Sequence, residues 1–407
     1  MSGALSHIRV LDLTRVLAGP WAAQMLGDLG AEIIKIERPG GGDDTRAWGP
    51  PYLTDDAGAT TAESAYFQCA NRNKKSVALD IAHPEGARIA RALAMQSDVL
   101  IENFKVGGLA QYGLDAASLR AANPRLIYCS ITGFGQTGPY APRAGYDVLV
   151  QGMGGLMSIT GPADGTPGAG PQKVGVALTD ILTGLYAGNA IMAALIHRER
   201  SGQGQTIDMA LLDVQVATLA NQAQNFLVTG SPPRRMGNAH PSIVPYEDFP
   251  TADGHMILGA GNDGQFARLC AVLGHPEWAA DARFRSNTDR VANRAALLEL
   301  LRAATRTRTT HEWVTALEAE AVPCGPINTL REVFDDPQVR ARELAVPMRH
   351  AVGADIRVVA SPIRLSATPP TYRLAPPLLG EHTRAVLREV LGLDEPQFAR
   401  LAGDGVI

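Results

Sequence analysis

The first third of the chain alternates between strand-like and helix-like segments, and this alternation restricts the fold more than any other feature. Segment 20–30 is an expected helix, because Pro20 suits a first turn and Gly30 suits a helix end. Segment 83–98 has the helical spacing of apolar residues. Apolar runs flank these helices and are the expected strands: 8–14, 31–38, 76–81, 99–104 and 125–135. Apolar strands joined through helices predict a parallel sheet covered on both faces.

The rest of the chain predicts a smaller domain inserted into a larger one. A long apolar helix, a strand with a helix, a Pro- and Gly-rich linker and a further strand are expected in turn, at 180–200, 202–228, 229–249 and 255–261. Strands and a helix resume near the C-terminus. We therefore expect a discontinuous large α/β domain at 1–229 and 326–407, with a small α+β domain and its linkers at 230–325.

Charge and composition exclude several kinds of partner. The formal net charge is −4 and the pI is near 6.2, so neither nucleic acid nor an anionic membrane is expected to bind. Aromatic residues make up only 5% of the chain, which is too few for a base-stacking surface. The four cysteines are far apart, and the N-terminus lacks the pattern of a signal peptide. A reducing cytoplasm fits these features best.

Several short motifs are ambiguous by themselves. "GAGNDG" at 259–264 fits a dinucleotide fingerprint, but no second parallel strand is expected after it, so a plain strand-to-helix turn is favoured. The basic cluster "NRNKKS" at 71–76 is either a solvated loop or a phosphate contact. Arg38 and the stretch 102–104 follow expected strands, where open α/β sheets bind ligands. No G-x-S-x-G and no H-E-x-x-H occurs, so neither a serine hydrolase nor a hydrolytic metal site is expected.

The stretch "VGVALTDILTGLYAG" at 174–188 places one acid, Asp180, among small and apolar residues. A charged side chain rarely lies among apolar residues unless it forms an ion pair, caps a helix or takes part in function. Three interpretations stay open: Asp180, together with Thr179, caps the long helix; it is a buried general acid or base; or it is a carboxylate nucleophile. The residue pattern alone favours the cap.

Taken together, the motifs resemble the class III CoA-transferases of the CaiB/BaiF family. Within that family, "DLTRVLAGP", "NRNKKS" and "SIVPYEDF" resemble most the succinate–hydroxymethylglutarate (glutarate) group. The matching segments run nearly end to end, at 10–46, 71–80, 102–115, 128–147, 155–162, 175–187, 240–254, 322–327 and 376–383.

The resemblance implies a fold and a reaction. It implies a Rossmann-like large domain, a small domain and an interlocked homodimer. It also implies that Asp180 attacks an acyl-CoA, forms a mixed anhydride, and then holds CoA as an aspartyl thioester until a carboxylic acid takes it. CoA enters as a substrate, and no metal, NAD or flavin is expected.

The matching positions imply where CoA and the acids bind. The residues that match CoA contacts of the family are Val16, Leu17, Arg38, Arg72, Asn73, Lys74, Lys75, Asn103, Phe104, Lys105, Gly135 and Gln136. Formyl-CoA transferase carries glutamine where Leu17 stands, so formyl or oxalyl transfer is not expected. Its glycine-rich flap corresponds to the shorter "MGNAHP" at 236–241. The acid site is expected to draw on Arg15, Arg46, Arg143, Tyr146, Gly237 and His240.

The expected substrates are succinyl-CoA and a C4–C6 dicarboxylic acid, whose second carboxylate requires a cation. Two alternatives stay open. The related α-methylacyl-CoA racemases carry Gly-His-Asp where this chain has Gly145, Tyr146 and Asp147, and tyrosine is a poor base near neutral pH. A non-catalytic CoA-binding protein is the second alternative, and the retained Asp180 argues against it.

Overall fold

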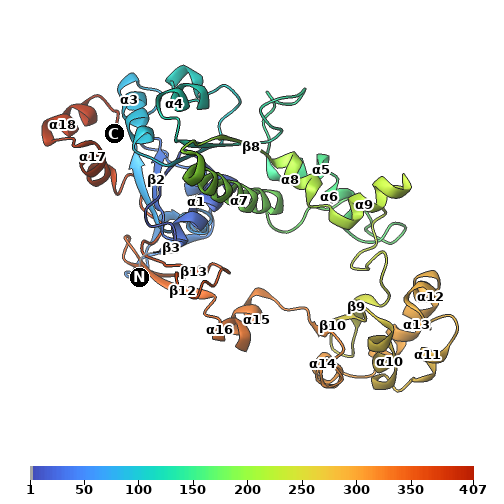
Figure 1. Cartoon of the computed structure of the whole chain (residues 1–407). Helices are drawn as coiled ribbons and strands as arrows, with labels where there is room; N and C mark the ends of the chain where they lie inside the picture. Colours follow the sequence, from blue (N-terminus) through green and yellow to red (C-terminus); the bar gives the residue numbers. More distant parts are fainter. Residues whose placement is uncertain (1–2) are drawn as a thin grey trace. The chain divides into compact units, whose positions relative to one another are not determined.

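The computed structural model describes residues 3–407 and divides the chain into two compact units (Figure 1). The larger unit runs from the first described residues to Leu156 and continues through 174–224 and 338–407. The smaller unit comprises 157–173 and 225–337. The domain boundaries expected from the sequence stay predictions.

A six-stranded sheet with the order β5-β2-β1-β6-β7-β8 forms the centre of the larger unit. Every neighbouring pair is parallel, which confirms the expected α/β fold with a parallel sheet. The strands are β1 (Arg9–Asp12), β2 (Glu32–Glu37), β5 (Lys74–Ala78), β6 (Val99–Glu102), β7 (Ile127–Thr132) and β8 (Thr206–Ala210).

Helices cover both faces of this sheet, because adjacent strand residues point to opposite sides. On one face Leu11 and Leu100 join a core with Leu93 of α3, and on the other Val10 and Ile101 join a core that includes α1 and α7. The helices that contribute to these cores are α1 (Ala18–Asp28), α3 (Pro84–Met95), α4 (Ala116–Ala122), α7 (Leu178–Ser201), α8 (Leu211–Ala217), α17 (Thr383–Leu391) and α18 (Glu395–Gly403).

Helix α7 is long and apolar enough to cross a membrane by length and composition, with a hydropathy of 1.3 in its most apolar window. Half of that window is buried inside the protein. Its inward residues, which include Ala187, Ile191 and Ala194, belong to the core shared with α1 and the sheet. These contacts are those of a core helix in a folded domain.

Short elements complete the larger unit, and three of them, at 156–159, 220–229 and 337–341, cross a boundary into the smaller unit. They are η1 (Asp44–Ala47), β3 (Tyr52–Thr54), β4 (Thr60–Ser64), α2 (Ala65–Gln68), η2 (Ala110–Tyr112), α5 (Asp147–Met153), α6 (Leu156–Ile159), α9 (Ala220–Thr229), α16 (Pro337–Ala341), β12 (Ala345–His350) and β13 (Ala354–Val359). The strands β12 and β13 pair only with each other, as an antiparallel hairpin outside the main sheet.

The smaller unit has its own apolar core, centred on Trp313, Phe249 and Phe266. A three-stranded antiparallel sheet and short helices enclose it: β9 (Tyr246–Pro250), β10 (His255–Gly259), β11 (Cys324–Pro326), α10 (Asp263–Val272), α11 (Glu277–Ala280), α12 (Asn287–Ala292), α13 (Arg294–Thr305), α14 (Thr310–Ala319) and α15 (Leu330–Asp335).

The glycine-rich stretch at 259–264 joins β10 to α10 in this unit. The side chain of Asn262 caps α10 by accepting from the Gln265 N–H. The neighbours of β10 are antiparallel to it, so the stretch lacks the parallel β-α-β setting of a dinucleotide site. The interpretation as a plain strand-to-helix turn is confirmed.

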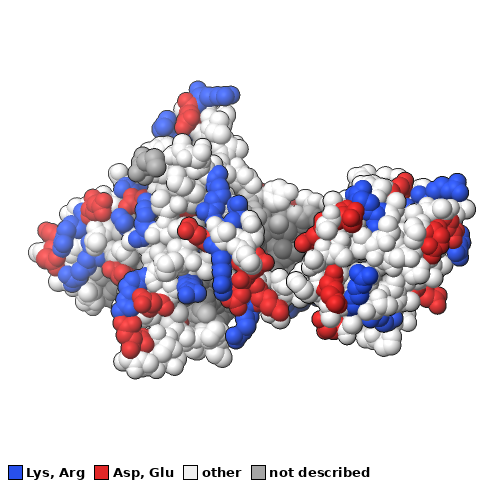
Figure 2. Space-filling model, turned by 90° about the horizontal axis from the view of Figure 1, so that it is seen from below, with Lys and Arg blue, Asp and Glu red and all other residues white. Residues whose placement is uncertain are grey.

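Charged side chains of both signs are interspersed on the face drawn in Figure 2, where Lys and Arg alternate with Asp and Glu. No extended surface of one sign is seen on that face. On this face, the distribution agrees with the near-neutral composition and offers no track for a nucleic-acid backbone.

Candidate active site

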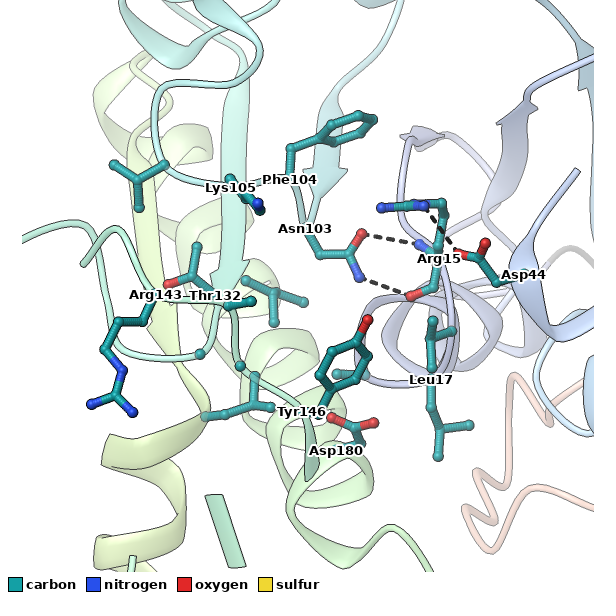
Figure 3. A pocket seen from close by; sticks show the side chains of 18 of the residues that line it. Arg15, Leu17, Asp44, Asn103, Phe104, Lys105, Thr132, Arg143, Tyr146 and Asp180 are labelled. Carbon is teal, nitrogen blue, oxygen red and sulfur yellow. Dashed lines mark hydrogen bonds and ion pairs between the residues drawn. The ribbon is translucent and has the colours of Figure 1, made fainter. Parts of the chain in front are cut away.

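A cavity of about 390 Å³ opens at the carboxyl ends of β1, β6 and β7 (Figure 3). This is the edge at which parallel α/β sheets bind their ligands. Its lining combines the loops after these strands with the first turns of α1 and α7, and includes Arg15, Val16, Leu17, Ala18, Asp44, Trp48, Asn103, Phe104, Lys105, Thr132, Arg143, Tyr146 and Asp180.

Asp180 lies in the first turn of α7 and is only 9% exposed. No described residue donates a hydrogen bond to its carboxylate. Burial, reinforced by the nearby charge of Asp147, raises the pKa of Asp180 to about 7. A buried, unpaired carboxyl group that faces a cavity is typical of a functional acid rather than a structural one.

The expectation that Asp180 caps α7 is wrong. The N-cap position is Ala177, which makes no capping bond with its side chain. Asp147 of α5 supplies the cap instead, because its Oδ1 accepts from the backbone N–H of Thr179 at 2.8 Å and of Asp180 at 3.3 Å. The side chain of Asp180 is therefore not needed to cap the helix, and it lines the cavity instead.

Asp147 is the residue that sequence reasoning missed. Its Oδ2 accepts from Gln151 Nε2 at 2.7 Å, and Gln151 Oε1 accepts from the N–H of Val174. Thr179 Oγ1 donates to Gln215 Oε1 of α8 at 2.6 Å. The only signal of Asp147 in the sequence was its position directly after Tyr146. The backbone N–H groups that Asp147 caps lie more than thirty residues further along the chain.

The loop before α1 is held in an unusual conformation. Val16 has a φ of 71°, in the left-handed region that β-branched residues avoid. Asn103 holds both sides of Arg15, accepting from its N–H at 3.0 Å and donating to its carbonyl at 2.8 Å, and Asp43 accepts from the Val16 N–H at 3.2 Å. Such conformations persist only where the surroundings fix them, and they cluster at functional sites. The structure therefore brings Val16, Leu17, Asn103, Phe104 and Lys105 together, as predicted.

Buried ion pairs lie beneath this loop. Lys35 pairs with Asp43 and Lys74 pairs with Asp12, both at 3.0 Å, and none of these side chains is exposed. Burial raises the pKa of Asp43, but Lys35 and the Thr45 N–H outweigh it and hold that pKa at about 2. Burial lowers the pKa of Lys74 to about 8. None of the four side chains lines the cavity that holds Asp180, whereas Lys35 and Asp43 line a second cavity beside it.

The basic cluster is engaged inside the protein. Arg72 pairs with Asp28 at 2.5 Å, Asn73 donates to Asp28, and Lys75 pairs with Glu32 at 2.6 Å. None of residues 72–75 lines the two large cavities of the larger unit. With Lys74 bound to Asp12, the four side chains have structural partners, and their contact with CoA stays a prediction that the cavities do not support.

A second cavity of about 290 Å³ shares Arg15, Asp44 and Phe104 with the first. Arg38 stands at its wall, as expected for a CoA contact, beside the apolar side chains of Leu79, Ile81 and Tyr112. The two cavities lie along the carboxyl ends of neighbouring strands, so a long ligand can extend from one into the other.

Gly135 and Gln136 follow β7 but do not line either of these cavities. Gly135 has a φ of 86°, which only glycine adopts readily. The backbone N–H of Gln136 donates to Asp208, and its side chain donates to Ser130. Gln136 instead lines a small cavity of about 90 Å³ that Lys105 also reaches.

The three arginines considered for a substrate carboxylate have different partners. Arg46 is buried and forms a two-pronged pair with Glu37, with both bonds at 2.8 Å, so it has no room for a second carboxylate. Arg15 pairs with Asp44 at the cavity. Arg143 also lines the cavity, where it stacks against the rings of Tyr140 and Phe134. No described carboxylate pairs with Arg143.

The other expected acid-site residues fall in different places. Tyr146 lines the cavity, next to Asp180 in Figure 3, and is 63% exposed. Gly237 and His240 belong to the smaller unit, where the His240 ring contacts Tyr246. Among residues 3–407, no group of three His, Cys, Asp or Glu side chains is arranged to hold a metal ion.

Comparisons with known proteins agree on one family. The model of CoA-transferase family III matches residues 5–383. The chain is 55% identical over 386 residues to a succinate–glutarate CoA-transferase of Agrobacterium fabrum, covering 95% of each chain. It is 45% identical over 403 residues to the succinyl-CoA:glutarate CoA-transferase of Homo sapiens, covering 99% of this chain and 90% of that one. The crystal structure of a CaiB/BaiF family protein from Brucella suis superposes with a TM-score of 0.84 at 49% identity, covering 96% of this chain and 100% of that one.

Proposed function

Because the chain belongs to CoA-transferase family III and is a CoA-transferase, we propose that it moves CoA from succinyl-CoA to a C4–C6 dicarboxylic acid, with Asp180 as the nucleophile. The observation that carries this proposal is Asp180 itself. It is a buried carboxyl group without a hydrogen-bond partner among the described residues, and it lines the cavity of about 390 Å³ at the carboxyl edge of the sheet.

The first half-reaction loads CoA onto the enzyme. A carboxylate oxygen of Asp180 attacks the thioester carbonyl of the donor, and the C–S bond breaks to give a mixed anhydride and CoA thiolate. The thiolate attacks the carbonyl of Asp180, and the anhydride C–O bond breaks to release the donor acid. One negative charge enters as the Asp180 carboxylate and leaves on the acid, so no external proton or cofactor is consumed.

The second half-reaction is the reverse with another acid. The acceptor carboxylate attacks the aspartyl thioester, thiolate leaves, and the thiolate then takes the acyl group from the new anhydride. Both covalent intermediates hydrolyse if water reaches them, so the site must be dry. The 9% exposure of Asp180 and the apolar Leu17 beside it in Figure 3 suit that requirement.

The two cavities offer a path for CoA. The thioester end belongs at Asp180, next to the rigid loop of Val16 and Leu17. The nucleotide end suits the second cavity, where Arg38 can pair with phosphate and Tyr112 and Ile81 offer apolar contact. Lys105 lines the first cavity and offers a second cation for the ligand.

The dicarboxylate part of the proposal rests on Arg143 and on the relatives. Arg143 lines the cavity that holds Asp180, and no described carboxylate neutralises it. Both reported relatives are named for succinate or succinyl-CoA and glutarate. In Figure 3 the Arg143 side chain points away from Asp180, and it rests on the rings of Tyr140 and Phe134. An acid with one carboxylate at Asp180 can form a charge-assisted pair with Arg143 once that side chain turns into the cavity.

A homodimer is part of this proposal, and each unit exposes apolar side chains that support it. In the larger unit Tyr186, Ile196 and Val216 are about half exposed. In the smaller unit Leu227 and Leu330 are 73% and 78% exposed. Exposed apolar residues at this density mark protein contacts more often than free surface. We place the enzyme in the cytoplasm, where its unpaired cysteines stay reduced.

A matrix of donors and acceptors tests the proposed substrates. The purified enzyme is mixed with succinyl-, acetyl- or 2-methylacyl-CoA and with mono- or dicarboxylic acids, and the acyl-CoA products are measured by mass spectrometry. We expect succinyl-CoA to glutaryl-CoA exchange. Activity with monocarboxylates alone would overturn the dicarboxylate assignment, and α-proton exchange of 2-methylacyl-CoA in deuterated water would identify a racemase instead.

The variant Arg143→Gln tests the acid site in the same assay. We expect the KM for the dicarboxylate acceptor to rise about tenfold or more, because a charge-assisted pair is lost, while the KM for acyl-CoA changes little. Arg15→Gln is the matched control at the other side of the cavity, since that arginine is already paired. Equal effects of the two variants on the acceptor would contradict the assignment.

A further inference from the structure

We propose that Asp147 is a positioning residue for CoA transfer: it fixes the first turn of α7, and its negative charge favours the uncharged, acylated forms of Asp180 over the free carboxylate. This inference rests on the proposed nucleophilic role of Asp180. It assigns a role to a carboxylate that never needs to touch the substrate.

The positioning part follows from the hydrogen bonds of Asp147. Its Oδ1 accepts from the N–H of Thr179 at 2.8 Å and of Asp180 at 3.3 Å, and its Oδ2 accepts from Gln151 at 2.7 Å. All three partners donate, so the carboxylate acts as an acceptor only, as its ionised form does. A negative group at a helix N-terminus is also favoured by the helix dipole.

The same geometry places two carboxylates together. Asp147 contacts the backbone of Asp180 directly, and the Asp180 side chain is buried with no cation paired to it. The other titratable groups around it are Tyr66, whose pKa is raised partly by Asp180, and the cavity residues Arg15, Asp44, Lys105, Arg143 and Tyr146. Arg15 is already paired with Asp44. Asp147 is thus the nearest full charge for which the structure shows a contact with this residue.

A like charge acts differently on the states of the reaction. The free Asp180 carboxylate carries one negative charge and is repelled by Asp147. In the anhydride and in the CoA thioester, the same side chain is neutral, and the charge has moved to the thiolate or to the released acid. Repulsion therefore raises the free energy of the resting nucleophile and not that of the covalent intermediates. Protonation and acylation both convert the charged Asp180 carboxylate into a neutral group. The repulsion that favours protonation of Asp180 therefore also favours its acylation.

The variant Asp147→Asn separates charge from structure. It keeps an oxygen that can accept from the Thr179 N–H and removes the negative charge. Its amide nitrogen replaces the oxygen that accepts from Gln151, so that hydrogen bond is lost as well. We expect the acidic limb of the kcat/KM profile to move down by about one pH unit. The fraction of enzyme held as CoA thioester, in a fixed mixture of succinyl-CoA and succinate, should fall about tenfold.

Thr179→Val is the matched control. It loses the bond to Gln215 at the same turn of α7 but changes no charge. Whatever its effect on kcat, both the pH midpoint and the thioester fraction should equal those of the wild type. If Asp147→Asn does not fold, Asp147→Ser, which also keeps a capping oxygen, gives the same two readouts.

The outcomes distinguish this inference from the proposed function. An Asp147 variant with an unchanged midpoint and an unchanged thioester fraction would overturn the inference, and so would an equal shift in Thr179→Val. In either case the wild type still forms the thioester, so the function stands. A wild type that forms no covalent CoA adduct while it transfers CoA would overturn the proposed function itself.

Discussion

At the residue scale, the site is defined by an acid whose environment opposes its charge. Burial and Asp147 together raise the pKa of Asp180 to about 7. A more basic carboxylate is a stronger nucleophile once it is ionised, and near pH 7 a substantial fraction of it is ionised. The sequence indicated Asp180 because an isolated acid among apolar residues is unusual. It could not indicate the cap, because Asp147 approaches only after α5 and α7 have packed together.

This raised pKa also predicts a link between stability and pH. The unfolded chain loses the Asp180 proton near the ordinary value of 3.8, whereas the folded chain keeps it up to about pH 7. The contribution of Asp180 to the free energy of unfolding therefore falls as the pH rises between these values, and it stays low above them. We expect Asp180→Asn to raise Tm by about 2 °C at about pH 8 and to change it little at about pH 4.

Differential scanning calorimetry of the two proteins at both pH values checks this expectation. An equal Tm difference at the two pH values would show that the effect is not the charge of Asp180. The activity of the wild type should rise with pH through the same range, because only the carboxylate attacks the thioester.

The arginines show the limit of residue-level prediction in another way. Arg15, Arg46 and Arg143 were equivalent in the sequence. The structure separates them by their partners, since Glu37 occupies Arg46 and Asp44 occupies Arg15. Which basic residue is already paired depends on contacts between distant segments, and no local pattern contains that information.

At the element scale, the packing of α1 on α7 positions Asp180, the proposed nucleophile. A Cβ at Gly184 would lie 2.7 Å from the carbonyl oxygen of Ala18, and one at Gly188 would lie 1.9 Å from the methyl group of Met25. The contact thus advances along both helices in the same direction, which means that they run parallel. Asp180 precedes Gly184 by one turn on the same face, so it lies over the start of α1.

A matched pair of variants tests this packing. Gly184→Ala meets backbone and the Trp21 side chain, which cannot move without separating the helices, whereas Gly188→Ala meets the end of a flexible methionine. We expect Gly184→Ala to cost about 1–3 kcal/mol of unfolding free energy and to lower kcat at least tenfold. Gly188→Ala should cost less and leave kcat near the wild-type value.

Denaturant unfolding and steady-state kinetics measure both quantities. We infer that the close approach of the helices at Gly184 sets the position of Asp180. Equal effects of the two variants would contradict this inference.

The main strands could be predicted at this scale, because fully buried parallel strands are continuous apolar runs. The expected strands 8–14, 31–38, 99–104 and 125–135 contain β1, β2, β6 and β7, and the expected strand 76–81 overlaps β5 only at residues 76–78. The order of strands and the separate hairpin of β12 and β13 could not be predicted. Strand order depends on which side each crossover takes, and the hairpin has the same alternating pattern as a sheet strand.

At the scale of the whole molecule, the apolar residues exposed by each unit support the proposed homodimer. Light scattering should give twice the chain mass of 43.1 kDa if the homodimer forms. Leu227→Asp places a charge on a side chain that is 73% exposed in the chain alone and should shift the protein toward monomer. Leu365→Asp, at a less exposed apolar position of the larger unit, serves as a comparison. A wild type that stays monomeric at micromolar concentration would contradict the dimer.

The central claim is that CoA is held on Asp180, and one measurement tests it most directly. The enzyme is incubated with succinyl-CoA without an acceptor acid, quenched in acid and digested with trypsin. Lys173 and Arg198 bound a peptide in which Asp180 is the only carboxylate side chain. We predict that this peptide carries the mass of CoA as a thioester, and that glutarate added before the quench removes it. An unmodified peptide in enzyme that still exchanges succinyl-CoA, or an adduct on the peptide that contains Asp147, would contradict the account.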